Sequence, residues 1–205
     1  MKAFIRTLLV GFAVLSTAAY CEDQPKQQYA SKPEYRALFL ELEKAEVITE
    51  GARDAKNVLY VFFDSNCFYC HLTWKALQPY GKVGLQVRWV PVAYQKPSSV
   101  GRAAAIMGAP DRAAALRENE VNYDRPHFDG GIKPVDKPQA QLAAQLQTNT
   151  ELMRKFGVPA TPLLVWKDSN GNVQIKPGVP RLSQLPGITG LPEQEVVDPD
   201  LAKFR

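Results

Sequence analysis

The stretch from Val58 to Cys70 reads Val-Leu-Tyr-Val-Phe-Phe-Asp-Ser-Asn-Cys-Phe-Tyr-Cys. Its first six residues form the apolar run of a buried strand, and the polar residues that follow are typical of a turn and a helix cap. If Cys67 begins a helix, its sulfur lies near unpaired backbone N–H groups and the positive end of the helix dipole, which favour the reactive thiolate. Cys70 lies on the same helix face and can close a disulfide. The pattern predicts a thiol–disulfide redox site.

A purely structural role for this cysteine pair is the less favoured alternative. A Cys67–Cys70 disulfide would close a very small loop and would therefore constrain the unfolded chain very little. The only other cysteine of the sequence is Cys21. We therefore expect Cys67 and Cys70 to act in catalysis.

The N-terminus has the pattern of a secretory signal peptide. Lys2 and Arg6 precede an apolar run at residues 8–15, and small residues follow as far as Ala19. Cleavage after Ala19 or after Cys21 fits this pattern, and a lipoprotein acylated at Cys21 is the alternative. We predict that residues 1–21 are removed. The apolar run is too short for a membrane span, and the sequence offers no other candidate.

Composition restricts the classes of partner. The chain has 205 residues, of which 25 are basic and 21 acidic, and removal of Lys2 and Arg6 leaves 23 basic residues. Because the remaining charge is nearly balanced and no stripe of basic residues is present, we expect no binding of nucleic acid or of an anionic membrane.

The hydrophobic periodicity predicts an α/β fold. Helices are predicted at residues 33–45, 67–78, 102–107, 111–120, 139–147 and 149–156, with a short one near residue 182. Strands are predicted at 58–63, 85–92, 163–166 and 173–176, and an extended piece at 46–50. This order is that of a thioredoxin-like fold with a helical insertion at about 98–157, preceded by an N-terminal helix.

The dipeptide Thr161-Pro162 stands at the start of a predicted strand. In thioredoxin-like proteins a similar dipeptide, with the proline in the cis form, lies against the active-site cysteines. By this resemblance Pro162 is the cis proline and Thr161 lines the substrate groove. We expect the backbone groups of Thr161 to be free for a substrate strand.

From about Phe39 to Gly190 the chain resembles the catalytic domain of the DsbC/DsbG-type thiol:disulfide interchange proteins, the DsbG side in particular. The resemblance is carried by residues 59–70, 101–107 and 156–162. It implies a periplasmic oxidoreductase in which Cys67 attacks and Cys70 resolves. It also implies protein substrates with disulfides or sulfenylated cysteines, and a membrane thiol electron donor of the DsbD type.

The resemblance also sets the expected domain organisation. Residues 22–56 have room for a tail and a linker-like helix, so we expect the N-terminal dimerisation domain of the family to be absent and the protein to be a monomer. Residues 57–205 form the predicted catalytic domain, with a tail at about 191–205 that extends beyond the resemblance.

Four other residues near the cysteine pair can affect its surroundings. Phe68 and Tyr69 are expected to form an apolar surface around the sulfur. His71, one turn after Cys67, either adds positive charge to the site or faces solvent, and Lys75 is expected to be solvated.

Three alternatives to the main function remain open. The first is a DsbA-type disulfide oxidase. The second is a c-type haem protein that uses Cys-x-x-Cys-His, with His71 as one axial ligand and Met107, Met153 or His127 as the other. The third is a chaperone-like binding module. The favoured hypothesis requires no cofactor and no metal.

Overall fold

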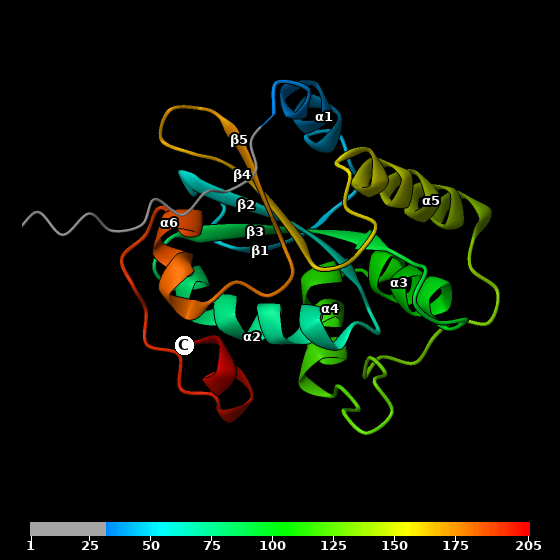
Figure 1. The fold of residues 1–205 in the computed structure, drawn as a ribbon. Helices are drawn as coiled ribbons and strands as arrows, with labels where there is room; N and C mark the ends of the chain where they lie inside the picture. The colour runs from blue at the N-terminus through cyan, green and yellow to red at the C-terminus, as the bar shows by residue number, and fades with distance from the viewer. Residues whose placement is uncertain (1–31) are drawn as a thin grey trace, which may run out of the picture.

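A five-stranded mixed sheet lies at the centre of the computed structural model, which describes residues 32–205 (Figure 1). The strands are β1 (Ile48–Gly51), β2 (Asn57–Asp64), β3 (Leu85–Val92), β4 (Leu163–Lys167) and β5 (Val173–Pro177). They lie in the order β1-β3-β2-β4-β5, in which β2 and β3 are parallel and the other neighbours antiparallel. Each predicted strand is present. The predicted signal peptide and Cys21 lie outside the described residues.

The helices are α1 (Tyr35–Leu42), α2 (Phe68–Gly81), α3 (Ser99–Gly108), α4 (Arg112–Val121), α5 (Ala140–Lys155) and α6 (Leu185–Thr189), with the 3-10 helices η1 (Leu182–Gln184) and η2 (Pro199–Phe204). Helices α3, α4 and α5 lie between β3 and β4 in the sequence. Helix α1 lies at the periphery, on the same side of the sheet as α5 (Figure 1).

Alternate side chains of β2 enter two different cores. Leu59, Val61 and Phe63 pack with residues of α2 and α4 on one face of the sheet. Tyr60 and Phe62 pack with residues of α1 and α5 on the other face. Because both faces are covered, β2 is apolar along almost its whole length, and this continuous run is what the sequence shows.

Several predicted helix bounds differ from the structure, and two of the differences have a clear physical reason. Residues 140–155 form one long helix, α5, instead of two pieces, because Asn149 continues the helix and its side chain donates to the carbonyls of Glu46 (3.2 Å) and Pro91 (3.0 Å). Helix α2 continues through Pro79 to Gly81 instead of ending before it. Pro79 lies in the last turn, where the loss of one helical hydrogen bond is tolerated more easily than in the middle.

The C-terminal segment forms η2, which the sequence analysis did not predict. Leu201 is fully buried in the core on the α2 side of the sheet. Lys75 of α2 forms ion pairs with Asp198 (2.8 Å) and Asp200 (3.1 Å). The expectation that Lys75 is a solvated residue is therefore wrong, since the C-terminal segment packs against it.

Two further findings concern residues 32–205, the part of the chain that the structure describes. Within this range no helix is both long and apolar enough to cross a membrane. The same residues contain no cluster of three or more histidine, cysteine, aspartate or glutamate side chains arranged to hold a metal ion.

Candidate active site

Cys67 lies at the N-cap of α2, directly after β2 and its turn. The residue is extended (φ −76°, ψ 112°), and its sulfur accepts a hydrogen bond from the backbone N–H of Cys70 at 3.2 Å. The sulfur therefore pairs one of the otherwise unpaired N–H groups at the start of the helix. The sequence predicts Cys67 as the first residue of the helix, and the structure puts it one position earlier, at the N-cap, where this contact is possible.

The two thiols are shifted in opposite directions. The hydrogen bond from the Cys70 side chain lowers the pKa of Cys67 against the opposing effect of burial, with further help from Thr161, the Cys70 backbone and Gln95. Burial raises the pKa of Cys70 well above its ordinary value, and the neighbouring Cys67 sulfur raises it further. Both cysteines are unbonded to each other and almost inaccessible, at 2% and 1% exposure. Cys67 is therefore the more acidic of the two thiols.

Thr161 and Pro162 lie against this pair. The peptide bond between them is cis, as the resemblance predicted. The Cys67 thiol donates to the Thr161 carbonyl, with sulfur and oxygen 3.6 Å apart. The structure therefore brings together Cys67 and the loop that precedes β4, although 94 residues separate them in the sequence.

The expectation that the backbone of Thr161 is free is wrong. Its N–H donates to the phenol oxygen of Tyr94 at 2.8 Å. The same phenol lies 3.1 Å from the Thr161 hydroxyl, to which the Gln95 amide also donates at 2.9 Å. Sequence reasoning missed Tyr94 and Gln95. Their position directly after the strand 85–92 was a usable signal, because the carboxyl ends of the parallel strands β2 and β3 meet at one edge of the sheet.

A buried carboxylate holds the loops of the site together. Asp64, at the end of β2, is 1% exposed. One of its oxygens accepts from the N–H of Asn66 (2.9 Å) and the hydroxyl of Ser99 (2.8 Å). The other accepts from the N–H groups of Tyr94 (2.9 Å) and Gln95 (3.1 Å). The turn before Cys67, the loop after β3 and the start of α3 are therefore all fixed to one side chain.

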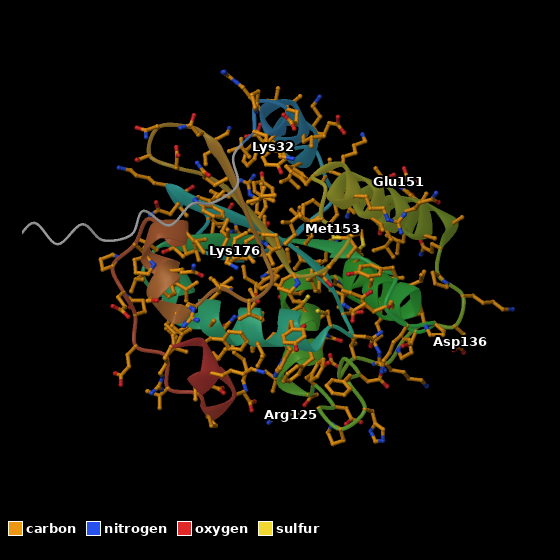
Figure 2. All side chains as sticks on the ribbon, viewed as in Figure 1. Lys32, Arg125, Asp136, Glu151, Met153 and Lys176 are labelled. Carbon is orange, nitrogen blue, oxygen red and sulfur yellow. The ribbon has the colours of Figure 1, made fainter. Side chains whose placement is uncertain are left out.

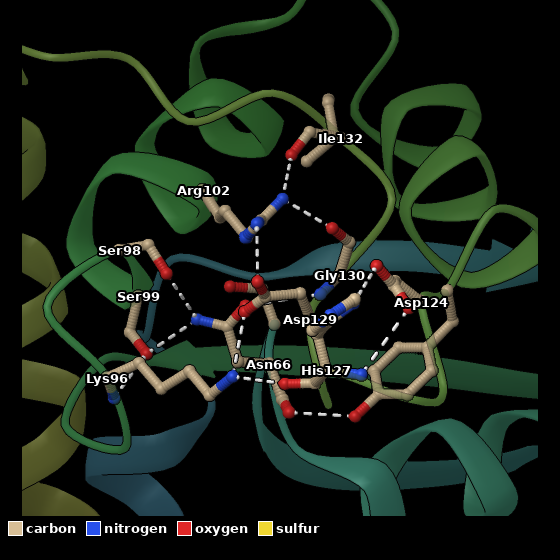
Figure 3. A network of polar contacts seen from close by, with 12 residues as sticks. Asn66, Lys96, Ser98, Ser99, Arg102, Asp124, His127, Asp129, Gly130 and Ile132 are labelled. Carbon is tan, nitrogen blue, oxygen red and sulfur yellow. Dashed lines mark hydrogen bonds and ion pairs between the residues drawn. The ribbon is translucent and has the colours of Figure 1, made fainter.

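Asn66, directly before Cys67, connects the site to the helical insertion (Figure 3). Its amide donates to the hydroxyls of Ser98 (3.2 Å) and Ser99 (3.0 Å), and its oxygen accepts from the N–H of Gly130 (3.1 Å). Arg102 donates to the carbonyls of Gly130 and Ile132.

Gly130 is required here for steric reasons. A Cβ atom on this residue would lie 2.1 Å from the Asn119 side chain and 2.3 Å from the carbonyl oxygen of Ser65. The loop after α4 therefore packs directly onto the turn that carries Cys67.

His71 is buried, so the interpretation as a solvent-facing residue is wrong. Its Nδ1 lies 3.0 Å from a carboxylate oxygen of Glu120 in α4, and its ring stacks on Tyr123 at 4.5 Å between centroids. Glu120 is 3% exposed, and its second oxygen accepts from the Asn119 amide at 3.0 Å. Glu120 was missed by the sequence analysis, although it stands four residues after Leu116 and so on the apolar face of its helix.

The residues proposed as haem ligands do not converge. His71 is held by Glu120, and the exposed His127 is paired with Asp124 at 2.8 Å. Met107 and Met153 are buried in the cores on opposite faces of the sheet, and Met153 points from α5 toward the sheet in Figure 2. This arrangement favours thiol exchange over haem attachment.

The surface around Cys67 is aromatic. Tyr69 and Phe128 are each 51% exposed, and Phe68 is half-buried between them, with its ring centroid 5.7 Å from each of theirs. The Arg125 guanidinium lies 5.6 Å from the Phe68 ring centroid and the Lys203 ammonium 5.8 Å from that of Tyr69. Figure 2 shows Arg125 at the surface. The insertion and the C-terminal segment thus both contribute to the surface next to Cys67.

The chain belongs to the thioredoxin-like family, because the family model described as a thioredoxin-like domain matches residues 43–185. Among individual proteins it is similar to the thiol:disulfide interchange protein DsbG of Pseudomonas aeruginosa, with 30% identity over 168 residues. DsbG of Escherichia coli is 28% identical over 169 residues. These alignments cover 82% and 80% of this chain and 64% of each relative. The predicted fold and the predicted resemblance are confirmed.

A solved structure supports the same fold. ScsC of Proteus mirabilis, in a transitional conformation, superposes with a TM-score of 0.60 at 23% identity, covering 78% of this chain and 80% of that one. The chain spans about two thirds of the length of the DsbG relatives, 64% in each case.

Proposed function

We propose that this chain is an exported thiol:disulfide oxidoreductase that reduces or isomerises disulfides of periplasmic proteins. The observation that carries the proposal is the asymmetry of the cysteine pair, in which the pKa of Cys67 is lowered and that of the buried Cys70 is raised. In this proposal the Cys67 sulfur is the nucleophile, and the Cys70 sulfur reacts only after Cys67 has reacted. The names of the relatives, which are thiol:disulfide interchange proteins, support the same activity.

The exchange proceeds in two steps. The Cys67 thiolate attacks one sulfur of a substrate disulfide, that S–S bond breaks, and the leaving thiolate takes a proton as the mixed disulfide forms. Cys70 then loses its proton and attacks the Cys67 sulfur, which releases the second substrate thiolate. The substrate gains two electrons, and the Cys67–Cys70 pair loses two. In isomerisation a substrate thiolate attacks the mixed disulfide instead, and the pair stays reduced.

Sulfenylated cysteines are a second substrate class within the proposal. The Cys67 thiolate attacks the sulfenic sulfur, the S–O bond breaks, and hydroxide leaves and is protonated to water. The mixed disulfide that results is resolved by Cys70 as before. In this proposal Phe68, Tyr69, Thr161 and Pro162 line the substrate groove, and the His71 imidazole, held 3.0 Å from Glu120, tunes the site.

A reductase needs a donor, since each turnover leaves a Cys67–Cys70 disulfide. We assign this role to a membrane thiol donor of the DsbD type and expect the protein to work as a monomer. A DsbA-type oxidase is the second candidate, because the lowered pKa of Cys67 is compatible with exchange in either direction. A stabilised thiolate stabilises the reduced form and makes the disulfide a stronger oxidant.

The redox titration of the mature protein tests the proposal. The protein is equilibrated in glutathione buffers of stepped potential and then denatured, the thiols are alkylated, and modified Cys67 and Cys70 are counted by mass. A single two-electron transition at roughly −100 to −200 mV is expected. A pair that never titrates, or that carries a covalent adduct, contradicts the proposal. The ability of the reduced protein to cleave a protein disulfide separates the reductase from the oxidase.

A further inference from the structure

The main-chain N–H next to the cis proline already has a partner in the free protein. Tyr94 places its phenol oxygen 2.8 Å from the nitrogen of Thr161. An extended polypeptide that adds to a protein as a strand pairs its carbonyl groups with such N–H groups. The phenol therefore occupies the position that a substrate carbonyl would take.

Three hydrogen bonds join Tyr94 and Gln95 to Thr161. The Tyr94 oxygen accepts from the Thr161 N–H, and the Thr161 hydroxyl oxygen accepts from the Gln95 amide at 2.9 Å. The Tyr94 phenol and the Thr161 hydroxyl also hydrogen-bond each other at 3.1 Å, with either oxygen as the donor. One phenol thus satisfies two polar groups of Thr161.

The second main-chain group of Thr161 behaves differently. Its carbonyl accepts from the Cys67 thiol at 3.6 Å. When Cys67 ionises, this hydrogen is lost and the carbonyl becomes available. The N–H is released only when the Tyr94 side chain moves.

The Tyr94 side chain can move away from Thr161 without a rearrangement of the loop. Tyr94 is 38% exposed, and the loop is held through the backbone N–H groups of Tyr94 and Gln95, which donate to Asp64. Rotation of the side chain toward solvent breaks the two phenol contacts and leaves the loop in place.

We propose that Tyr94 is a specificity-determining residue, whose phenol competes with the main chain of a polypeptide substrate for the N–H of Thr161. This proposal rests on the proposed disulfide exchange. A small disulfide without a peptide backbone does not need the N–H and reacts with Tyr94 in place. A polypeptide has to displace the phenol, so the residue penalises extended substrates selectively.

The test compares two substrates in the full mature protein. One is a blocked extended peptide whose single cysteine carries a 2-mercaptoethanol mixed disulfide, and the other is bis(2-hydroxyethyl) disulfide. Tyr94→Phe keeps the ring and removes the competing oxygen. The ratio of kcat/KM for the peptide to kcat/KM for the small disulfide should rise about two- to tenfold, the effect of one net hydrogen bond, mainly through a lower KM. Tyr35→Phe makes the same change on the other side of the sheet, where the phenol donates to the carbonyl of Phe156, and should leave the ratio unchanged.

A second readout follows the N–H directly. Hydrogen exchange of the Thr161 amide should be faster in Tyr94→Phe than in wild-type protein. An unchanged substrate ratio, or equally slow amide exchange, in a variant that folds and turns over the small disulfide overturns the proposal. A wild-type protein that turns over neither substrate refutes the proposed function, and this proposal with it.

Discussion

Replacing His71 by leucine should destabilise the protein strongly, because it leaves a buried carboxylate without one of its two partners. Glu120 is 3% exposed, and its side chain has two hydrogen-bond partners, His71 and Asn119. Removal of one partner of a buried, hydrogen-bonded carboxylate costs about 3–5 kcal/mol. The His71 side chain is 11% exposed, which favours the lower end of that range. Loss of the stacking on Tyr123 adds about 0.5–1.5 kcal/mol.

Urea unfolding at neutral pH measures the effect as a change in the free energy of unfolding. His71→Leu should lose about 3 kcal/mol or more. The double variant His71→Leu with Glu120→Leu should recover much of this loss, because replacement of a whole buried pair by apolar residues is far cheaper than removal of one partner.

The chain supplies a matched control for this prediction. His127 and Asp124 form a pair of the same chemistry at 2.8 Å, but both side chains are largely exposed. His127→Leu should leave the unfolding midpoint unchanged, because water solvates both groups. The reasoning is refuted if His71→Leu unfolds within 1 kcal/mol of wild type, a margin well below the expected cost, or if the double variant is less stable than the single one.

Three further predictions concern the loop, the nucleophile and the C-terminal segment. Gly130→Ala should lower the free energy of unfolding by about 1–3 kcal/mol in a urea titration, since the new Cβ collides with the carbonyl of Ser65. Alkylation of Cys67 by iodoacetamide should persist to a lower pH than that of an ordinary thiol, while Cys70 stays unreactive. Because folding lowers the pKa of Cys67, its thiolate stabilises the reduced folded protein at pH values above the usual thiol pKa. This contribution is lost as the pH falls through the lowered pKa. Equal pH profiles of alkylation for the two cysteines would contradict the lowered pKa of Cys67. Leu201→Ala should cost about 2–5 kcal/mol, and an unchanged unfolding midpoint would show that the C-terminal segment does not contribute to the core.

The central part of the fold could be predicted because its signals are local. The apolar run of β2, the polar turn after it and the cysteine spacing lie within 13 consecutive residues. Strand β3 was predicted with its observed bounds, since glycine precedes it at Gly84 and its apolar pattern ends with Val92. Such signals depend on neighbours in the sequence, which are available without a structure.

The contacts that complete the site are not local. Helical spacing puts His71 one turn after Cys67, but only the packing of α4 decides that Glu120 covers it. Tyr94 reaches Thr161 across 67 residues. The path of the chain in space determines such pairs, and one sequence does not reveal it.

In the loop after β3, the backbone anchors the loop to Asp64, and the side chains of Tyr94 and Gln95 contact Thr161. The loop after β3 is fixed through main-chain N–H groups, which every amino acid except proline provides. The identity of the side chains at positions 94 and 95 is thus independent of what anchors their backbone. A library randomised at these two positions would vary the contacts to Thr161 while the loop backbone stays anchored to Asp64, which makes this loop a suitable starting point for engineering substrate preference.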